Sequence, residues 1–248
     1  MKKLFSTIAL CVFSLAGTAD EFKAASDIWS PFFMVSSNGY SGIGVEVLNE
    51  VVRRSGDKVS FHSMPTKRAH VMFDNNDVDI MVLDSAFWNS DYQMKTIIFT
   101  DDIMSVQEYI YLLQENDITI TTPSDLKGKT VNILRGYSYP LVNHEFKEGL
   151  FHYQELDNET SLIKTLLLNR ADAIFMDSVA FQYSISIMGH DNALFSRGMQ
   201  LSNATLGIKI RKEKNHILPR FNKAIADMKK DGTIDNIISK YTKGFSVQ

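Results

Sequence analysis

The 248-residue sequence contains a single cysteine, Cys11, so no intramolecular disulfide can stabilise the fold. Cys11 lies in an N-terminal segment that resembles a secretion signal, with two early lysines, a mostly apolar stretch at 4–15 and small residues after it. We expect residues 1–19 to be a signal peptide that is cleaved near Ala19, which places the mature protein in the periplasm. The mature chain then has no cysteine and depends on its core alone, without thiolate metal ligands.

The sequence also lacks the segments that are typical of several other classes of protein. After the first 19 residues there is no long apolar run, no low-complexity linker and no long block of like charge. Removing residues 1–19 takes away two lysines and changes the net charge from −3 to −5. This balance argues against nucleic acid as a partner, because phosphate contacts need clustered lysine and arginine. The same net charge is compatible with a small solute as the ligand. We expect the protein to be a monomer.

Motifs for metals and phosphate-bearing cofactors are missing as well. The chain has no glycine-rich phosphate loop and no dinucleotide fingerprint. His144-Glu145 with Glu148 is similar to the zinc-binding pattern His-Glu-x-x-His, but the second histidine is absent. We therefore expect no cofactor and no bound metal.

What the sequence does contain is a short internal repeat. Four polar residues recur 93 positions later, with an apolar run between the two acids of each copy; the pairs are Asn76 and Asn169, Asp79 and Asp172, Asp84 and Asp177, Ser85 and Ser178. Apolar residues three and four apart precede each copy, as in a helix. A helix followed by a buried strand is half of a parallel α/β layer, so the repeat predicts two similar lobes that face each other across a cleft. Chance similarity between two ordinary helix–strand units is the alternative.

The repeat also predicts where a ligand binds. Polar residues that follow a buried parallel strand emerge at the carboxyl edge of the sheet, where open α/β folds place ligands. The candidates for the cleft are therefore Asp84, Ser85, Asp177 and Ser178. The other two aspartates of the repeat, at the strand entrances, are expected to be structural.

Patterning predicts further elements along the chain. Alternation and β-forming residues indicate strands at 58–64, 105–114, 130–134, 153–156 and 205–210. Apolar residues at helical spacing indicate helices at 45–52, 218–228 and 234–241. The first of these helices is expected to end at Gly56.

The order and spacing of several short motifs are more specific than any one of them. These are Trp29 to Phe32, Gly42-Ile43-Gly44-Val45, Asp79 after its helix, Phe99-Thr100-Asp101, Asp125 to Lys129, Gly136, Asp177 and Lys230 to Ile234. In this order they resemble the extracellular solute-binding proteins of the polar amino acid type (family 3), the periplasmic receptors of ABC importers. The likeness covers nearly the whole mature chain.

The resemblance implies an α/β fold of the periplasmic binding protein-like type II, with two α/β lobes joined by two crossing hinge segments. Matching the family pattern assigns residues 20–108 and 205–248 to lobe 1 and residues 109–204 to lobe 2. The crossings would lie near 106–111 and 202–206. Ligand would bind between the lobes, and closure of such a hinge is a familiar conformational switch.

One position departs from the family pattern. In amino-acid receptors of this family, an arginine six residues before the Phe of the Phe-Ser/Thr-Asp motif holds the ligand carboxylate, and this chain has Gln93 there. A neutral amide provides neither the charge nor the fork geometry of a guanidinium. Arg68, on the helix before the first repeat copy, and Arg135, at a strand end, are candidates for the missing charge. Each of them can instead be an ordinary exposed arginine.

The remaining candidates are polar or aromatic residues in expected loops and strand ends. The resemblance implies that Asp177 holds a ligand ammonium, and aromatic loop residues can stack on a ligand or a cation. The full set that we expect to bind ligand is Trp29, Arg68, Ser85, Trp88, Gln93, Arg135, Tyr137, Ser138 and Asp177.

These observations favour a periplasmic receptor that captures a small polar solute, amino acid-like or another charged metabolite, and delivers it to the permease of an ABC importer. The main alternative is a receptor that signals to a membrane sensor kinase or cyclase. A periplasmic dehydratase, lyase or hydrolase on the same fold is a further alternative. The segment 136–140 is similar to a nucleophile elbow around Ser138, but Pro140 replaces the second glycine. We predict no catalytic residue.

Overall fold

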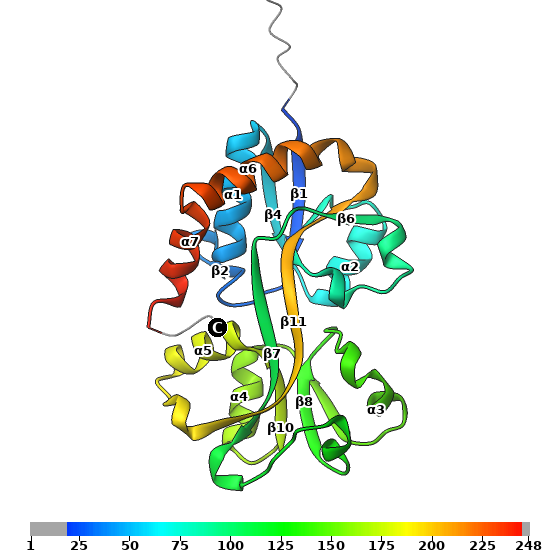
Figure 1. Ribbon diagram of the computed structural model, residues 1–248, viewed down its shortest axis with the longest axis vertical. Helices are drawn as coiled ribbons and strands as arrows, with labels where there is room; N and C mark the ends of the chain where they lie inside the picture. Colours follow the sequence, from blue (N-terminus) through cyan, green and yellow to red (C-terminus); the bar gives the residue numbers. More distant parts are fainter. Residues whose placement is uncertain (1–18, 245–248) are drawn as a thin grey trace, which may run out of the picture.

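The computed structural model describes residues 19–244 and has two α/β lobes stacked along its long axis (Figure 1). Lobe 1 contains β1 (Glu21–Ser26), β2 (Met34–Ser36), β3 (Gly39–Ser41), α1 (Ile43–Ser55), β4 (Lys58–Ser63), α2 (Thr66–Asp74), β5 (Ile80–Asp84), β6 (Ile97–Phe99), α6 (Leu218–Lys230) and α7 (Thr233–Thr242). Lobe 2 contains β8 (Thr130–Leu134), α3 (Asn143–Lys147), β9 (His152–Leu156), α4 (Glu159–Leu167), β10 (Ala173–Asp177) and α5 (Ser178–Met188). The long strands β7 (Met104–Leu113) and β11 (Phe195–Arg211) run through both lobes.

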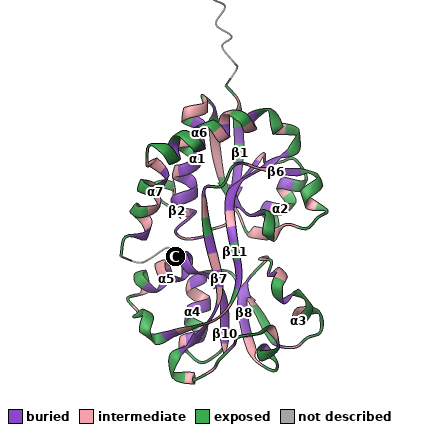
Figure 2. Ribbon diagram, viewed as in Figure 1, coloured by how far each residue is buried: buried purple, intermediate pink, exposed green. Residues whose placement is uncertain are grey.

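Each lobe is built on three parallel strands with one antiparallel neighbour. In lobe 1 the strand order is β4-β1-β5, and β11 pairs antiparallel with β5. In lobe 2 the order is β9-β8-β10, and β7 pairs antiparallel with β10. All five residues of β5 and all five of β10 are buried, as expected for strands that are covered on both faces. Figure 2 shows this burial running through the strands of both lobes.

The internal repeat is confirmed by the secondary structure. Helices α2 and α4 begin and end 93 residues apart, and so do strands β5 and β10. Asn76 and Asn169, which follow the two helices, both have positive φ values, 70° and 52°. Asparagine adopts this left-handed conformation more readily than most residues, which explains why it stands at both positions.

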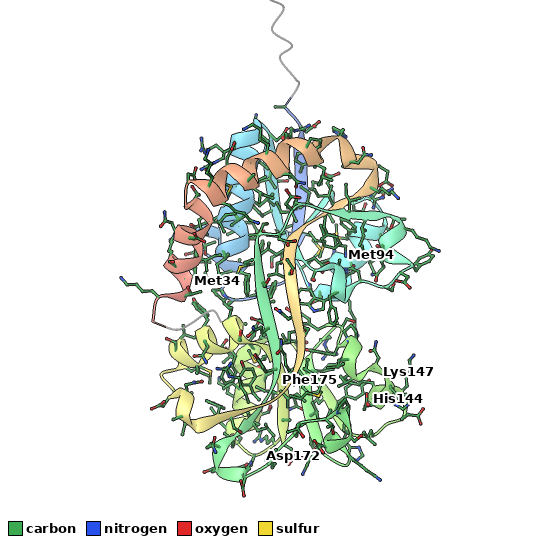
Figure 3. The ribbon with its side chains drawn as sticks, viewed as in Figure 1. Met34, Met94, His144, Lys147, Asp172 and Phe175 are labelled. Carbon is green, nitrogen blue, oxygen red and sulfur yellow. The ribbon has the colours of Figure 1, made fainter. Side chains whose placement is uncertain are left out.

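The aspartates at the entrances of the two strands also have matching structural roles. Asp79 Oδ2 accepts a hydrogen bond from the backbone N–H of Lys23 at 3.0 Å, and Asp172 Oδ2 accepts one from Thr130 N–H at 2.7 Å. In both cases the carboxylate holds the start of the neighbouring parallel strand. Figure 3 shows Asp172 at the end of lobe 2 that faces away from lobe 1.

We predict that Asp172→Ala lowers the free energy of unfolding by about 1 to 2 kcal/mol, because the partly buried Thr130 N–H loses its carboxylate acceptor. Urea unfolding followed by circular dichroism would measure this change. Asp172→Asn is the matched control, since it retains an acceptor oxygen and should lose less. Equal stability of wild type and the alanine variant would show that this bond contributes nothing.

A crossing strand and a helix of lobe 2 are among the elements that differ from the sequence-based expectation. Strand β11 spans 17 residues rather than six, and helix α5 was not expected at all. The α5 sequence is apolar around most of its circumference, so it gives no helical period to detect. Its ends carry the only clear signals: the Asp177 side chain accepts a hydrogen bond from Ala180 N–H at 2.8 Å, and Gly189 ends the helix with φ 72°.

The strands β7 and β11 contain both expected crossing segments. They pair antiparallel with each other, and the register joins Ser202 to Glu108 and Ala204 to Val106. The two segments therefore cross between the lobes as one hydrogen-bonded ribbon. The lobe boundaries at 108–109 and 204–205 stay a prediction, and the expected signal peptide lies almost entirely outside residues 19–244.

Aromatic packing stabilises the core of each lobe. Phe22 of β1 packs edge-on against Phe221 of α6 at 5.7 Å between ring centroids. Tyr111 of β7 stacks on Phe181 of α5 at 3.6 Å.

Among residues 19–244, no helix combines the length and apolarity needed to cross a membrane.

Candidate functional site

A cavity lies between the two lobes, within a space of about 700 Å³ that includes the open solvent at its mouth. Lobe 1 supplies the loop after β1, one face of α2, the end of β5 and the loop after it. Lobe 2 supplies the turn after β8 and the end of β10, and β7 supplies one residue where it crosses. The lining residues are Ser26, Asp27, Trp29, Thr66, His70, Met81, Leu83, Asp84, Trp88, Asn89, Glu108, Gly136, Tyr137, Ser138 and Asp177.

Two tryptophans donate hydrogen bonds to two buried carboxylates in this cavity. Trp29 Nε1 of lobe 1 donates to Asp177 Oδ2 of lobe 2 at 2.8 Å, so this bond joins the lobes. Trp88 Nε1 donates to Glu108 Oε2 at 3.1 Å. The two indoles meet edge to face with 6.1 Å between their centroids. Together they form an aromatic wall whose polar edges are directed at the carboxylates.

Asp177 closes β10 and opens α5, which fixes its position at the lobe boundary. One of its oxygens caps the helix through Ala180 N–H, and the other accepts from the Trp29 indole. Burial raises the pKa of Asp177 to about 6, and these two hydrogen bonds oppose that shift.

Glu108 lies on β7 at the crossing between the lobes and is only 5% exposed. Burial raises its pKa to about 7; the hydrogen bonds that its Oε2 accepts from Ser202 Oγ and Trp88 Nε1 oppose the shift, and the charge of Asp177 adds to it. Within residues 19–244, no hydrogen bond reaches the second oxygen, Oε1. Glu108 is therefore a buried acid whose Oε2 accepts from two neutral donors and whose Oε1 can accept a further hydrogen bond.

Asp84 has a different environment, because a buried lysine neutralises it. Lys209 Nζ of β11 lies 2.9 Å from Asp84 Oδ2 and 2.6 Å from Asn89 Oδ1. The ammonium also lies 5.2 Å from the centroid of the Phe73 ring. Burial, and next the positive charge of Lys209, lower the pKa of the nearby His70. Both effects favour the neutral form of the imidazole.

The structure brings five of the nine expected site residues together around the cavity: Trp29, Trp88, Tyr137, Ser138 and Asp177. Asp84, expected at the cleft, lies there too. Ser178 is buried at the start of α5 and does not belong to the lining.

The other four expected residues lie outside the lining. Arg68 is exposed on α2, and Ser85 is buried, where its Oγ accepts from Phe87 N–H at 3.3 Å. Gln93 Oε1 accepts from Ser90 N–H at 2.9 Å within a local turn. Arg135 is exposed and pairs with Asp157 at 2.7 Å and with Glu155 at 3.1 Å. Their assignment to the site stays a prediction.

Sequence reasoning missed several lining residues, among them Asp27, His70 and Glu108. Glu108 was detectable in principle, since it is the one charged residue within the β-forming run of β7. Thr66 and His70 are four apart on α2, a spacing that places both on one helix face.

Comparison with known proteins assigns this arrangement to a family. The sequence profile of the bacterial extracellular solute-binding proteins, family 3, matches residues 23–244. The chain belongs to this family. The resemblance found from the short motifs is thereby confirmed, and this family 3 protein is a solute-binding protein that functions outside the cytoplasm.

Individual relatives share about a quarter of their residues with this family 3 protein. It is 26% identical to the histidine-binding periplasmic protein of Escherichia coli (strain K12) over 258 aligned positions, which cover 97% of both chains. The solved structure of an ancestral arginine-binding protein bound to arginine has a TM-score of 0.75 at 24% identity, with 89% of this chain and 97% of that chain covered. A histidine kinase sensor domain with similarity to periplasmic binding proteins also has a TM-score of 0.75, at 18% identity, with 93% and 98% covered. These neighbours confirm the type II fold.

Proposed function

We propose that this family 3 protein captures a small polar solute, amino acid-like or another charged metabolite, in the cavity between its lobes and delivers it to the permease of an ABC importer. The observation that carries the proposal is the composition of the lining, which comes from both lobes and from the crossing strand β7. The Escherichia coli relative is a histidine-binding periplasmic protein, which supports a ligand of amino acid size.

Hinge closure would follow from these contacts. A ligand shifts the balance between open and closed forms only by its preference for one of them, so it must contact both lobes to favour closure. The bond from Trp29 of lobe 1 to Asp177 of lobe 2, at 2.8 Å, shows that side chains reach across the boundary. Met34, which Figure 3 shows next to lobe 2, accepts a second inter-lobe bond from Tyr183 OH at 3.3 Å.

A ligand screen by thermal shift would test solute capture, since a bound ligand raises the apparent stability by mass action. Amino acids, amines, oligopeptides, organic acids and sugars form the panel. For any hit, small-angle scattering should show a decrease in the radius of gyration at saturation. A hit that leaves the scattering profile unchanged would contradict closure.

We predict that Asp177→Asn weakens the binding of such a hit by tenfold or more. The reason is the loss of one charge-assisted contact, which contributes about 1.5 to 3 kcal/mol. Isothermal titration at pH 8 would measure the affinity.

Two further variants sharpen this prediction. Asp172→Ala removes an aspartate from the entrance of the same strand and should leave the affinity unchanged, so equal losses in both aspartate variants would point to a general folding defect. Arg68→Ala tests the sequence-based site beyond the cavity: unchanged affinity would remove this exposed arginine from it.

Signalling to a membrane sensor is the second candidate, because the sensor domain of a histidine kinase shares the fold. Co-purification with either a permease or a sensor from membranes would distinguish the two.

We further propose binding without turnover: recovery of the unchanged solute after prolonged incubation supports this, whereas a product whose formation Ser138→Ala abolishes would overturn it. Mass spectrometry of the exported protein tests cleavage near Ala19, and light scattering tests the monomer.

A further inference from the structure

The charged residues that line the cavity are nearly all acidic. Of the described lining residues, four are carboxylates: Asp27, Asp84, Glu108 and Asp177. None is lysine or arginine, and the one histidine is His70. The cavity thus gathers acidic groups between the two lobes, of which Asp84 is paired with Lys209.

Three cations that adjoin the lining residues are committed to other groups. Lys209 is buried against Asp84 and Asn89 behind the lining. Arg135, which adjoins the lining residue Gly136, turns its guanidinium to Asp157 at 2.7 Å. Lys67, beside the lining residue Thr66, lies 3.3 Å from Glu155.

Three of the four lining carboxylates have only neutral partners. Asp27 Oδ2 accepts from Thr66 Oγ1 at 2.7 Å, Glu108 from an indole and a serine, and Asp177 from an indole and a backbone N–H. Buried carboxylates without a cation are destabilised in their ionised form. Burial raises the pKa of each of the three for this reason. A cation placed among them would restore the charge balance.

The uncharged residues of the lining are also suited to a cationic ligand. Trp29, Trp88 and Tyr137 contribute aromatic side chains to the lining, and Met81 and Leu83 contribute apolar ones. Aromatic faces attract ammonium groups, most strongly where water is excluded. The unpartnered Oε1 of Glu108, on a residue 95% buried, is an acceptor for an N–H donor.

We propose that the cavity selects small organic cations that carry an amine and no carboxylate. A ligand carboxylate would meet three carboxyl groups that have no counter-ion and find no free guanidinium or ammonium among the described lining residues, whereas an amine would be held by Glu108, Asp177 and the two indoles. This inference rests on the proposed function, since it names the class of solute that the receptor captures.

Matched pairs of ligands that differ only in the carboxylate test the inference. Histamine against histidine, agmatine against arginine, and cadaverine against lysine are titrated into the full protein at pH 8. At least one amine is expected to bind at least tenfold more tightly than its amino acid, equivalent to about 1.4 kcal/mol. Calorimetry in buffers of different ionisation enthalpy at pH 6.5 should also show protons released when the amine binds.

A charge-matched pair of variants locates the effect. Glu108→Gln should weaken amine binding by tenfold or more, whereas Asp227→Asn removes an exposed carboxylate of α6 and should change the affinity less than twofold. Equal effects in the two variants would mean that net charge rather than the cavity attracts the amine, which overturns the inference.

The outcomes separate this inference from the proposed function. If an amino acid binds more tightly than every amine, or if only organic acids or sugars bind, selection of carboxylate-free cations is wrong and solute capture stands. If nothing in the panel binds, both are wrong.

Discussion

Lys209→Met is expected to lower the free energy of unfolding by about 3 to 5 kcal/mol, because it leaves Asp84 buried without its counter-ion. The Lys209 side chain is 2% exposed and that of Asp84 is 9% exposed, so water cannot take the place of the ammonium. Methionine has a similar length and retains the packing on Phe73, so the expected loss reflects charge rather than volume. Urea unfolding at pH 8 would measure it.

A second substitution separates the charge effect from other causes. In the double variant Lys209→Met with Asp84→Asn no carboxylate is left unpaired, so most of the lost stability should return. Lys223→Met, at an exposed ion pair on α6, is the matched control and should change stability by no more than about 0.5 kcal/mol. If Lys209→Met costs no more than this control, the buried pair does not stabilise the fold.

Glu108→Gln is expected to make the ligand-free protein more stable than wild type above pH 7, by about 3 kcal/mol. Burial raises the pKa of Glu108 from 4.5 to about 7, so the folded state holds a proton that the unfolded state has released. Wild type therefore loses stability relative to the variant as the pH rises from about 4.5 to about 7. Below pH 4.5 the carboxyl is protonated in both states, and this contribution vanishes.

The groups that face Glu108 make this titration specific. Ser202 and Trp88 donate to it, and among residues 19–244 the charged neighbour that raises its pKa further is Asp177 at the end of β10. Denaturant midpoints measured from pH 4 to pH 8 would give the two profiles. Glu21→Gln, at an exposed position on β1, should leave the wild-type profile unchanged. Parallel profiles for wild type and Glu108→Gln would show that the carboxyl is not buried as described.

The effect of Glu108→Gln on stability is the opposite of its expected effect on ligand binding. The substitution that stabilises the empty protein is also the one expected to weaken amine binding. A site that is destabilised when empty and compensated when occupied is a recognised cost of function.

The sequence predicted much of the fold because the signal is duplicated. The recurrence of Asn76, Asp79 and Asp84 as Asn169, Asp172 and Asp177 marks the same turn, strand entrance and strand end in each lobe. Such local patterns depend on residues within ten positions of each other. Strands β7 and β11, by contrast, pair across long separations that no local pattern records.

The candidate site was harder to predict, because the direction of a side chain depends on the element that carries it. On α2, Thr66 and His70 share the face that lines the cavity, and Arg68 lies two residues from each, on another face. Gln93 is bound within its own turn. Lys209 and Asp84 are 125 residues apart in the sequence, so only the folded structure shows that the Lys209 ammonium pairs with the Asp84 carboxylate.

Ser202 of β11 pairs with Glu108 of β7 where the two strands cross between the lobes. Partners in neighbouring strands stand about 5 Å apart, so the chain leaves lobe 1 and re-enters it at almost the same point. Lobe 2 is thus an insertion with adjoining ends, and a tight turn would suffice to close the gap if it were cut out. Exchange of whole lobes between relatives passes through these two adjoining joints, which offers evolution a way to replace one half of the cavity lining while the other half is kept.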